Sequence, residues 1–371
     1  MNVYDWYGVL PQDVLVLFEK ETGIRVHYDV FDNNEMLEAK LLATNSGYDV
    51  VFPTLTPYAA RQLDLGIYQK INHARLPNLR PLEPFLAEKM KKIDPNMTVL
   101  LPYYWGTTGL AFDADKLETL LPNTPKEGYD LLFDPHIIKI LAPHGISFLQ
   151  EAVDVFPAFF AFLGKNQDNR DLNDLFAASL QLNAIGKKVR RFSSARFVAD
   201  LVSGDVCLAQ AWSGEALRAI EDAKKVGRNI RYIIPKKGAD IWVDAIAIPV
   251  GAPHVANAHV FINFLLRPDI SARITNYSKM ATMVAAAKPF LEPQILQDPL
   301  IFPPDDVLES LHIPLHYAGQ EANRYERVRN RIWSQIKMHR KVTPTYFQEL
   351  LQKQRTHNAG KTSNKEQLYG S

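Results

Sequence analysis

The chain has 371 residues, of which 47% are apolar and 22% charged, and its formal net charge is +1. This length indicates two domains or three, and a chain with neither a basic nor an acidic surplus gives no support to a nucleic-acid partner. The single cysteine, Cys207, excludes an intrachain disulfide and lies in an apolar run, where packing is its expected role.

The first hundred residues alternate short strands with amphipathic helices. Strands are expected at 2–4, 24–30 and 49–52, and a helix follows each of them. Pro11 and Asn33 are typical of helix starts, and Gly23 is typical of a helix end. This alternation predicts a mostly parallel sheet with helices on both faces.

Residues 99–113 are apolar and aromatic, with small residues in the middle. They are expected to form a pair of strands that crosses between two lobes. Gly106 and Gly109 are candidates for a hinge, although turn formation explains them equally well.

A second block of alternating elements follows. Helices are expected at 148–163, 171–184, 195–202, 215–225, 255–266, 307–311 and 325–339, and strands at 206–211, 229–235 and 242–249. Two such blocks joined by more than one crossover predict a two-lobed α/β fold with a ligand cleft between the lobes. Lobe one is expected at 1–105 and 227–277, and lobe two at 106–226 and 278–345. The polar residues 346–371 are expected to be a flexible tail.

The stretch 205–215 carries a candidate binding site. Its apolar strand ends at Trp212, and Glu215 opens the next helix. Ligands of open α/β sheets bind where strands end, and an indole beside a carboxylate suits an organic cation. The alternative is that Trp212 packs in a core and Glu215 only complements the helix dipole.

Sequence motifs of enzymes are missing: the chain has no GxxxxGK[ST], GxGxxG, HExxH or GxSxG pattern. The histidine pairs His254 with His259 and His312 with His316 lack the glutamate of a zinc motif. Binding without turnover is therefore the leading class, no cofactor is expected, and an enzyme on a two-lobed scaffold is kept as an alternative.

Motifs along most of the chain carry a family resemblance. The chain resembles the polyamine-binding periplasmic receptors of ABC importers, which take putrescine and spermidine, from Val3 to about Lys337. The motifs are Val3-Tyr-Asp-Trp6, Phe18-Glu-Lys-Glu-Thr-Gly-Ile24, Tyr28-Asp-Val-Phe-Asp-Asn-Asn-Glu35, Tyr48-Asp-Val-Val-Phe-Pro-Thr54, Leu101-Pro-Tyr-Tyr-Trp-Gly-Thr-Thr-Gly109, Trp212-Ser-Gly-Glu215, Trp242-Val-Asp244 and Arg327-Val-Arg-Asn-Arg-Ile-Trp333.

This resemblance implies a type II periplasmic-binding-protein fold and a set of ligand-contacting residues. The implied residues are Trp6, Thr54, Asp154, Ser194, Trp212, Glu215, Trp242, Asp244 and Met280. Aromatic faces would shield the methylene groups of a polyamine, and carboxylates at separated points would take its ammonium groups.

The resemblance further implies a non-catalytic, monomeric receptor in the periplasm that delivers its ligand to ABC permease subunits. No leader is recognisable after Met1, which fits a processed protein and equally a cytosolic one. An amine-sensing adaptor on the same fold, which signals to a membrane protein, is the alternative function.

Three positions depart from the family pattern. Gly8 and Val9 stand where the family usually has an acid and a tyrosine, and Met280 stands in place of another tyrosine. One end of the cleft is therefore expected to be less acidic and less aromatic. We expect weaker or altered polyamine binding, with a preference for a ligand that has only one strongly cationic end.

Overall fold

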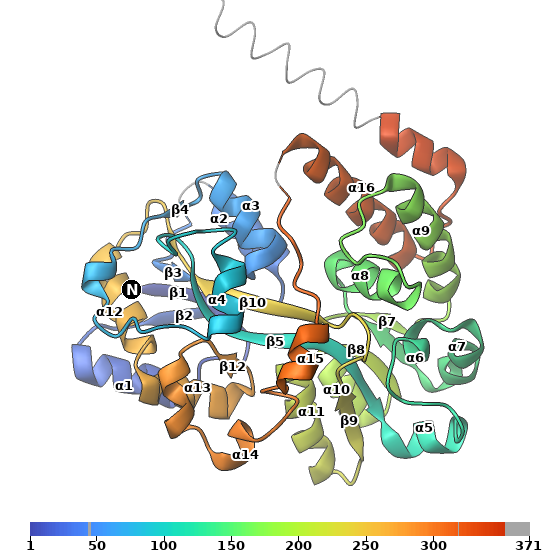
Figure 1. Cartoon of the computed structure of the whole chain (residues 1–371), viewed down its shortest axis with the longest axis horizontal. Coiled ribbons are helices and arrows are strands. Elements are labelled where there is room, and N and C mark those ends of the chain that lie inside the picture. The colour runs from blue at the N-terminus through green and yellow to red at the C-terminus, as the bar shows by residue number, and fades with distance from the viewer. Residues whose placement is uncertain (44–45, 318, 353–371) are drawn as a thin grey trace, which may run out of the picture.

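A computed structural model describes residues 1–43, 46–317 and 319–352. Figure 1 shows two halves side by side, with the long strands of the central sheet running from one half into the other. The first half contains the N-terminus, and the second contains most of the middle of the chain together with the last long helix.

The first half begins with a three-stranded parallel sheet in the order β2-β1-β3. Its elements are β1 (Asn2–Trp6), α1 (Gln12–Thr22), β2 (His27–Phe31), α2 (Asn34–Leu42) and β3 (Val50–Val51). Gly23 ends α1 in the left-handed conformation, and the Asn33 side chain caps α2 by accepting a hydrogen bond from the Met36 amide. The parallel arrangement expected for the N-terminal strands is confirmed.

The first half is completed by short elements and by chain from beyond residue 240. These elements are α3 (Ala60–Asp64), β4 (Tyr68–Gln69), α4 (Pro84–Met90), β10 (Asp240–Ile246), β11 (Ile248–Pro249), α12 (Val255–Leu265), α13 (Pro268–Ser278), β12 (Ala281–Thr282), α14 (Pro293–Leu296) and α15 (Asp305–Ser310). A π-helical turn, Leu55–Ala59, leads into α3.

Strand β5 (Leu101–Asp113) runs through both halves of the molecule. The expectation of two strands at 99–113 is wrong, because this segment forms one strand of 13 buried residues. The small residues serve close packing: a Cβ on Gly106 would lie 2.3 Å from the Trp242 ring, and one on Gly109 would lie 2.2 Å from the Ile233 carbonyl oxygen. Glycine is therefore required at both positions for close approach and not for a turn.

A seven-stranded mixed sheet, to which β5 belongs, extends into the second half. In it β10, β8, β9 and β12 pair with β5, and the order continues from β8 to β6 and β7. Its elements are α5 (Ala114–Leu120), α6 (Asp130–Phe133), α7 (Pro135–Leu141), β6 (Ile146–Phe148), α8 (Ala152–Phe162), α9 (Leu172–Gly186), β7 (Arg191–Phe192), α10 (Phe197–Ser203), β8 (Leu208–Trp212), α11 (Ser213–Lys225), β9 (Ile230–Ile233) and α16 (Gln320–Lys337).

Hydrophobic packing divides the chain differently from the predicted lobes. One cluster joins residues of 1–105 with Leu217 and residues of 239–311. A second joins residues between 110 and 208 with residues of 325–350, and a third contains residues between 111 and 232. Residues 280–311, assigned from the sequence to lobe two, thus pack in the first half, because β12 follows α13 and pairs with the first-half end of β5. Residues 230–232, assigned to lobe one, pack in the second half through the pairing of β9 with β5.

The predicted C-terminal tail is in part a packed helix. Residues 344–352 are helical, Phe347 and Leu350 are buried, and Phe347 stacks on Phe176 with 4.6 Å between ring centroids. The rest of the predicted tail, 353–371, lies outside the described residues.

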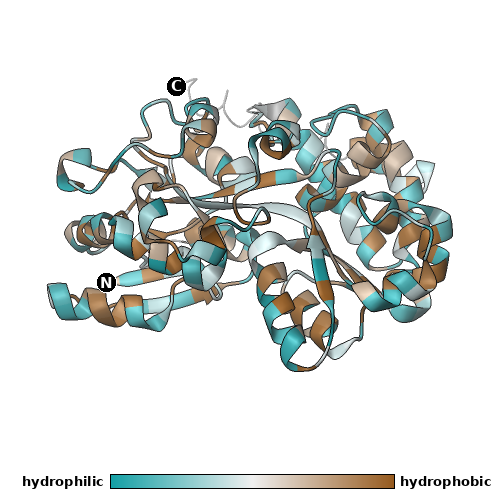
Figure 2. Cartoon of the chain, turned by 60° about the horizontal axis from the view of Figure 1, so that its bottom comes forward, coloured by the Kyte–Doolittle hydropathy of each residue, from teal (hydrophilic) through white to brown (hydrophobic). Residues whose placement is uncertain are grey.

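Hydrophilic and hydrophobic residues are mixed along the outer helices, as amphipathic packing requires (Figure 2). Helix α11 is an example, with Ala216, Leu217 and Ala219 buried and Lys224 and Lys225 exposed. Within the ranges that the structure describes, no helix is both long and apolar enough to span a membrane.

Candidate functional site

A cavity that opens to solvent lies between the two halves, and its empty space together with the adjoining solvent measures about 1100 Å³. Its wall combines the ends of β1 and β8, the strands β5 and β10, the start of α8 and residues of the segment that leads to α16. Eight of the nine residues expected to contact ligand line it: Trp6, Thr54, Asp154, Trp212, Glu215, Trp242, Asp244 and Met280. The ninth, Ser194, does not.

Three tryptophans form the aromatic part of the wall. The Trp6 indole donates to the Phe52 carbonyl oxygen at 2.9 Å, which fixes its ring at the end of β1. Trp6 and Trp212 meet edge to face, with centroids 6.0 Å apart and planes at 72°. Trp242 lies against Gly106 on the neighbouring strand. These faces can surround methylene groups and attract a cation.

Asp244 is the acid that the first half contributes, from β10. It is 3% exposed and accepts a hydrogen bond from the Thr54 hydroxyl at 2.6 Å, while Asn34 donates to that hydroxyl at 2.9 Å. Burial raises the pKa of Asp244 well above its ordinary value, although the Thr54 bond opposes this shift. An oriented, buried carboxyl with no basic partner gains stability from a cation placed beside it.

Asp154 is the corresponding acid of the second half, in the first turn of α8. It accepts hydrogen bonds from the Trp212 indole at 3.1 Å and from the Thr108 hydroxyl at 3.4 Å. Burial raises its pKa to about 7, against the effect of these bonds. The hydrogen bond from Trp212 thus joins the aromatic wall to this acid. The alternative that Trp212 only packs in a core does not explain this bond.

Glu151 is a cavity acid that the sequence reasoning missed. Burial, followed by the charge of Asp154, raises its pKa to about 8. Ser194 donates to Glu151 and accepts from the Gln150 amide at 3.0 Å. Ser194 therefore positions an acid at the cavity wall. The signal available in the sequence was the spacing of Glu151 and Asp154, which places both at the start of one helix.

Glu215 lies in the first turn of α11 and has an internal partner. The Arg218 guanidinium donates to one of its oxygens at 3.2 Å, and the other oxygen is buried with no hydrogen-bond partner among the residues that the structure describes. Burial raises the pKa of Glu215, and the Arg218 charge opposes the shift.

Two of the three departures from the family pattern, Gly8 and Met280, lie against helix α11, which carries this acid. Gly8 has a positive φ of 75°, and its carbonyl oxygen accepts from Arg218 at 2.6 Å. Val9 is completely buried in the first hydrophobic cluster. Met280 lines the cavity and lies against Gly214.

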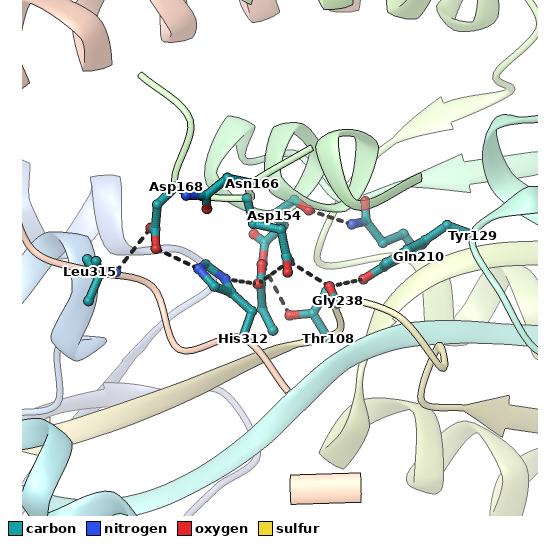
Figure 3. A network of polar contacts seen from close by, with 11 residues as sticks. Thr108, Tyr129, Asp154, Asn166, Asp168, Gln210, Gly238, His312 and Leu315 are labelled. Carbon is teal, nitrogen blue, oxygen red and sulfur yellow. Dashed lines mark hydrogen bonds and ion pairs between the residues drawn. The ribbon is translucent and has the colours of Figure 1, made fainter. Parts of the chain in front are cut away.

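A histidine that joins two acids forms a further part of the wall. His312 contacts Asp240 at 2.6 Å and Asp168 at 2.8 Å through its two ring nitrogens (Figure 3). Both contacts favour the charged imidazole and raise the pKa of His312 to about 9, although burial opposes the shift. Sequence reasoning considered His312 only as a metal ligand with His316, which instead contacts Asp64 at 3.0 Å.

The remaining wall carries two guanidinium groups. Arg170 and Arg329 both pair with Glu326, and Arg170 also lies over the rings of Tyr317 and Tyr325. These side chains come from the end of the α8–α9 connection and from α16. Nothing in their local sequence separates them from surface charges.

This fold and this cavity are those of a solute receptor, and the chain belongs to the family described as bacterial extracellular solute-binding protein, whose sequence profile matches residues 15–303. It is 35% identical to the putrescine-binding periplasmic protein PotF of Escherichia coli and 36% identical to the putrescine-binding periplasmic protein SpuD of Pseudomonas aeruginosa, over 91% of each chain in both comparisons.

Solved structures show the same fold. The chain aligns with the spermidine/putrescine ABC transporter substrate-binding protein PotD of Streptococcus pneumoniae with a TM-score of 0.73 and 22% identity, covering 92% of this chain and 99% of that one. The family resemblance and the two-lobed periplasmic-binding-protein fold inferred from the sequence are both confirmed.

Proposed function

We propose that the chain is a non-catalytic receptor that captures a polyamine or a related amine between its two halves. The observation that carries this proposal is the pair of half-buried Asp154 and buried Asp244, two acids from opposite halves on one tryptophan-lined cavity. Neither forms an ion pair with a basic side chain among the described residues. A cationic ligand supplies the missing charge, and its binding to both halves favours the closed state.

The ligand contacts follow from the wall. Trp6, Trp212 and Trp242 surround the methylene chain, and Asp154 and Asp244 accept hydrogen bonds from ammonium groups. Thr54 orients Asp244. Glu215 and Met280 form the wall at one end of the cavity, and Ser194 acts through Glu151. Each cation–aromatic contact contributes about 0.5–2 kcal/mol.

Delivery to the permease of an ABC importer is the corresponding physiological role, with the receptor acting as a monomer in the periplasm. The names of the relatives describe periplasmic binding proteins for putrescine and for spermidine with putrescine, and that of the PotD structure describes an ABC transporter substrate-binding protein, which supports transport over a sensing adaptor.

A thermal-shift screen tests the proposal. Diamines, triamines, guanidino compounds and amino acids are added to the purified chain, and the midpoint of unfolding is recorded. A ligand at a hundred times its dissociation constant stabilises the folded state by about 2.7 kcal/mol. Stabilisation by alkylamines is expected. Stabilisation by amino acids or other solutes, with none by any amine, would contradict the proposal.

A further inference from the structure

The three predicted cavity acids differ in how their charge is balanced. Glu215 forms an ion pair with Arg218, whereas the structure's described residues provide no such partner for Asp154 or Asp244. Glu215 lines the cavity, and Arg218, which lies behind it and outside the lining, already supplies this acid with a cation that belongs to the protein.

Arg218 joins the two halves of the molecule at this end. It lies on α11 in the second half, and its Nη1 donates to the carbonyl oxygen of Gly8, in the loop between β1 and α1 of the first half, at 2.6 Å. Its Nη2 donates to Glu215 at 3.2 Å. One guanidinium thus binds the Glu215 carboxylate and also contacts the opposite half of the molecule. The planar guanidinium of arginine, with several N–H donors, suits two such contacts.

Gly8 is what makes room for this guanidinium. A Cβ atom on residue 8 would lie 2.2 Å from Nη1 of Arg218, which is far inside van der Waals contact. The backbone at Gly8 has a φ of 75°, which favours glycine in addition. The loop therefore cannot carry a side chain while Arg218 is in its present position, and the two residues depend on each other.

The consequence for ligand choice follows from the charges. The second oxygen of Glu215 has no hydrogen-bond partner in the described part of the chain, and Glu215 lines the cavity, so a ligand that reaches this oxygen can donate one hydrogen bond to it. The net charge of the Glu215–Arg218 pair is zero, however, and an ammonium group placed there would be repelled by the guanidinium. A neutral donor such as a hydroxyl or an amide satisfies the oxygen without that repulsion.

Given the proposed amine-binding function, on which this step rests, we infer that Arg218 is a specificity-determining residue. Its guanidinium takes the place of one ligand ammonium at the Glu215 end. The site therefore selects amines with one ammonium group and a neutral polar end, such as amino alcohols and N-acylated diamines, over diamines of the same length.

Calorimetric titrations with two ligands of equal length test this inference. The ligands are 1,4-diaminobutane and 4-aminobutan-1-ol, which differ only in the second polar group. The wild type is expected to bind the amino alcohol at least as tightly as the diamine. Arg218→Met leaves Glu215 without a cation, and the ratio of the two dissociation constants should shift toward the diamine by at least about tenfold.

Further variants separate charge from folding. Arg218→Lys keeps the cation and should keep the wild-type preference, and Lys225→Met removes an exposed charge from the same helix and should leave the ratio unchanged. Gly8→Asp adds an acid where Nη1 now lies and should shift the ligand preference in the same direction as Arg218→Met. Aspartate is chosen because it tolerates a positive φ better than most residues.

The outcomes distinguish this inference from the function on which it rests. A wild type that prefers the diamine, or a ratio that stays within about twofold of the wild-type value in both Arg218→Met and Gly8→Asp, overturns the role of Arg218 but leaves amine binding intact. A wild type that binds neither amine overturns the amine-binding function, and the inference with it.

Discussion

Two pairs of acids, each with one buried and one half-buried member, face the same cavity, and they differ in what lies between them. Asp240 on β10 and Asp168 in the α8–α9 connection are joined by His312, which contacts both. Asp244, on the same strand, and Asp154, at the start of α8, have no basic residue between them in the described chain.

Each pair draws one acid from each half, so the difference is one of charge and not of location. A charged imidazole within hydrogen-bond distance of two carboxylates offsets their burial and ties the halves together. In the pair without such a cation, the cost of removing the carboxylates from water is not offset, and a ligand can supply the missing positive charge. We therefore propose that the joined pair serves structure and the open pair serves binding.

The largest effect is expected from Asp244→Asn. Loss of a buried charge partner should weaken amine binding by roughly 2–5 kcal/mol, as seen when one member of a buried ion pair is removed. The ligand-free variant should also unfold at a higher temperature near pH 8, because a buried acid without a cation no longer has to ionise. Calorimetry and thermal denaturation measure the two effects.

The control for this variant is Asp222→Asn, which changes an acid that is paired with Lys225 on the exposed face of α11. It should alter neither quantity. Unchanged affinity in Asp244→Asn would show that the open pair is not the ammonium site.

A smaller loss of affinity is expected from Trp212→Ala. The substitution removes an aromatic face and the indole that donates to Asp154, and we expect a loss of about 1–3 kcal/mol. Trp212→Phe keeps a face without the donor and should fall between the two in calorimetric titrations. Tyr277→Ala, at an exposed site outside the cavity, is the matched control. Equal affinities of wild type and Trp212→Ala would exclude an aromatic contact.

A change in affinity with pH should sharpen the comparison. The pKa of Asp154 is raised to about 7 and that of Glu151 to about 8, so both acids are partly protonated near neutral pH without ligand. A cation favours their ionised forms, so binding should release protons and tighten as pH rises from 6 to 8, by several-fold. Binding heats in buffers of different ionisation enthalpy measure the protons released. Proton uptake, or none at all, would contradict this.

The smallest effect is expected at the joined pair. The pKa of His312 rises from 6.5 to about 9 on folding, so its contribution to stability is complete below pH 6.5 and is lost as the pH rises through 9. His312→Asn should remove this pH dependence, which we expect to be on the order of 1 kcal/mol, and should leave amine binding largely intact. Thermal denaturation of both proteins at pH 6.5, 8 and 9.5 provides the measurement. Parallel pH profiles for the two proteins would show that His312 does not hold this pair of acids together.

The sequence was sufficient for the parts of the fold that depend on local pattern. Helix limits at Gly23 and Asn33 follow from capping chemistry, and the N-terminal strands follow from alternation with helices. The segment 99–113 could not be predicted in the same way, because Gly106 and Gly109 have the composition of a turn. Their real requirement is set by Trp242 and by β9, which are more than a hundred residues away.

The site shows the same limit. Trp212 and Glu215 stand out because they follow an apolar strand, and the family resemblance adds the other expected residues. Glu151 was missed although its spacing from Asp154 was a signal, whereas Arg218 and His312 could not be identified, because their roles depend on contacts made only after folding. Charge balance between distant residues is a property of the assembled cavity, and no local pattern encodes it.

The most direct test compares the two pairs of acids in one calorimetric series with 4-aminobutan-1-ol. We expect saturable one-site binding to the wild type and to His312→Asn, and no measurable binding to the double variant Asp154→Asn with Asp244→Asn. Binding to the double variant as tight as to the wild type would contradict the claim that the open pair of acids recognises the ligand.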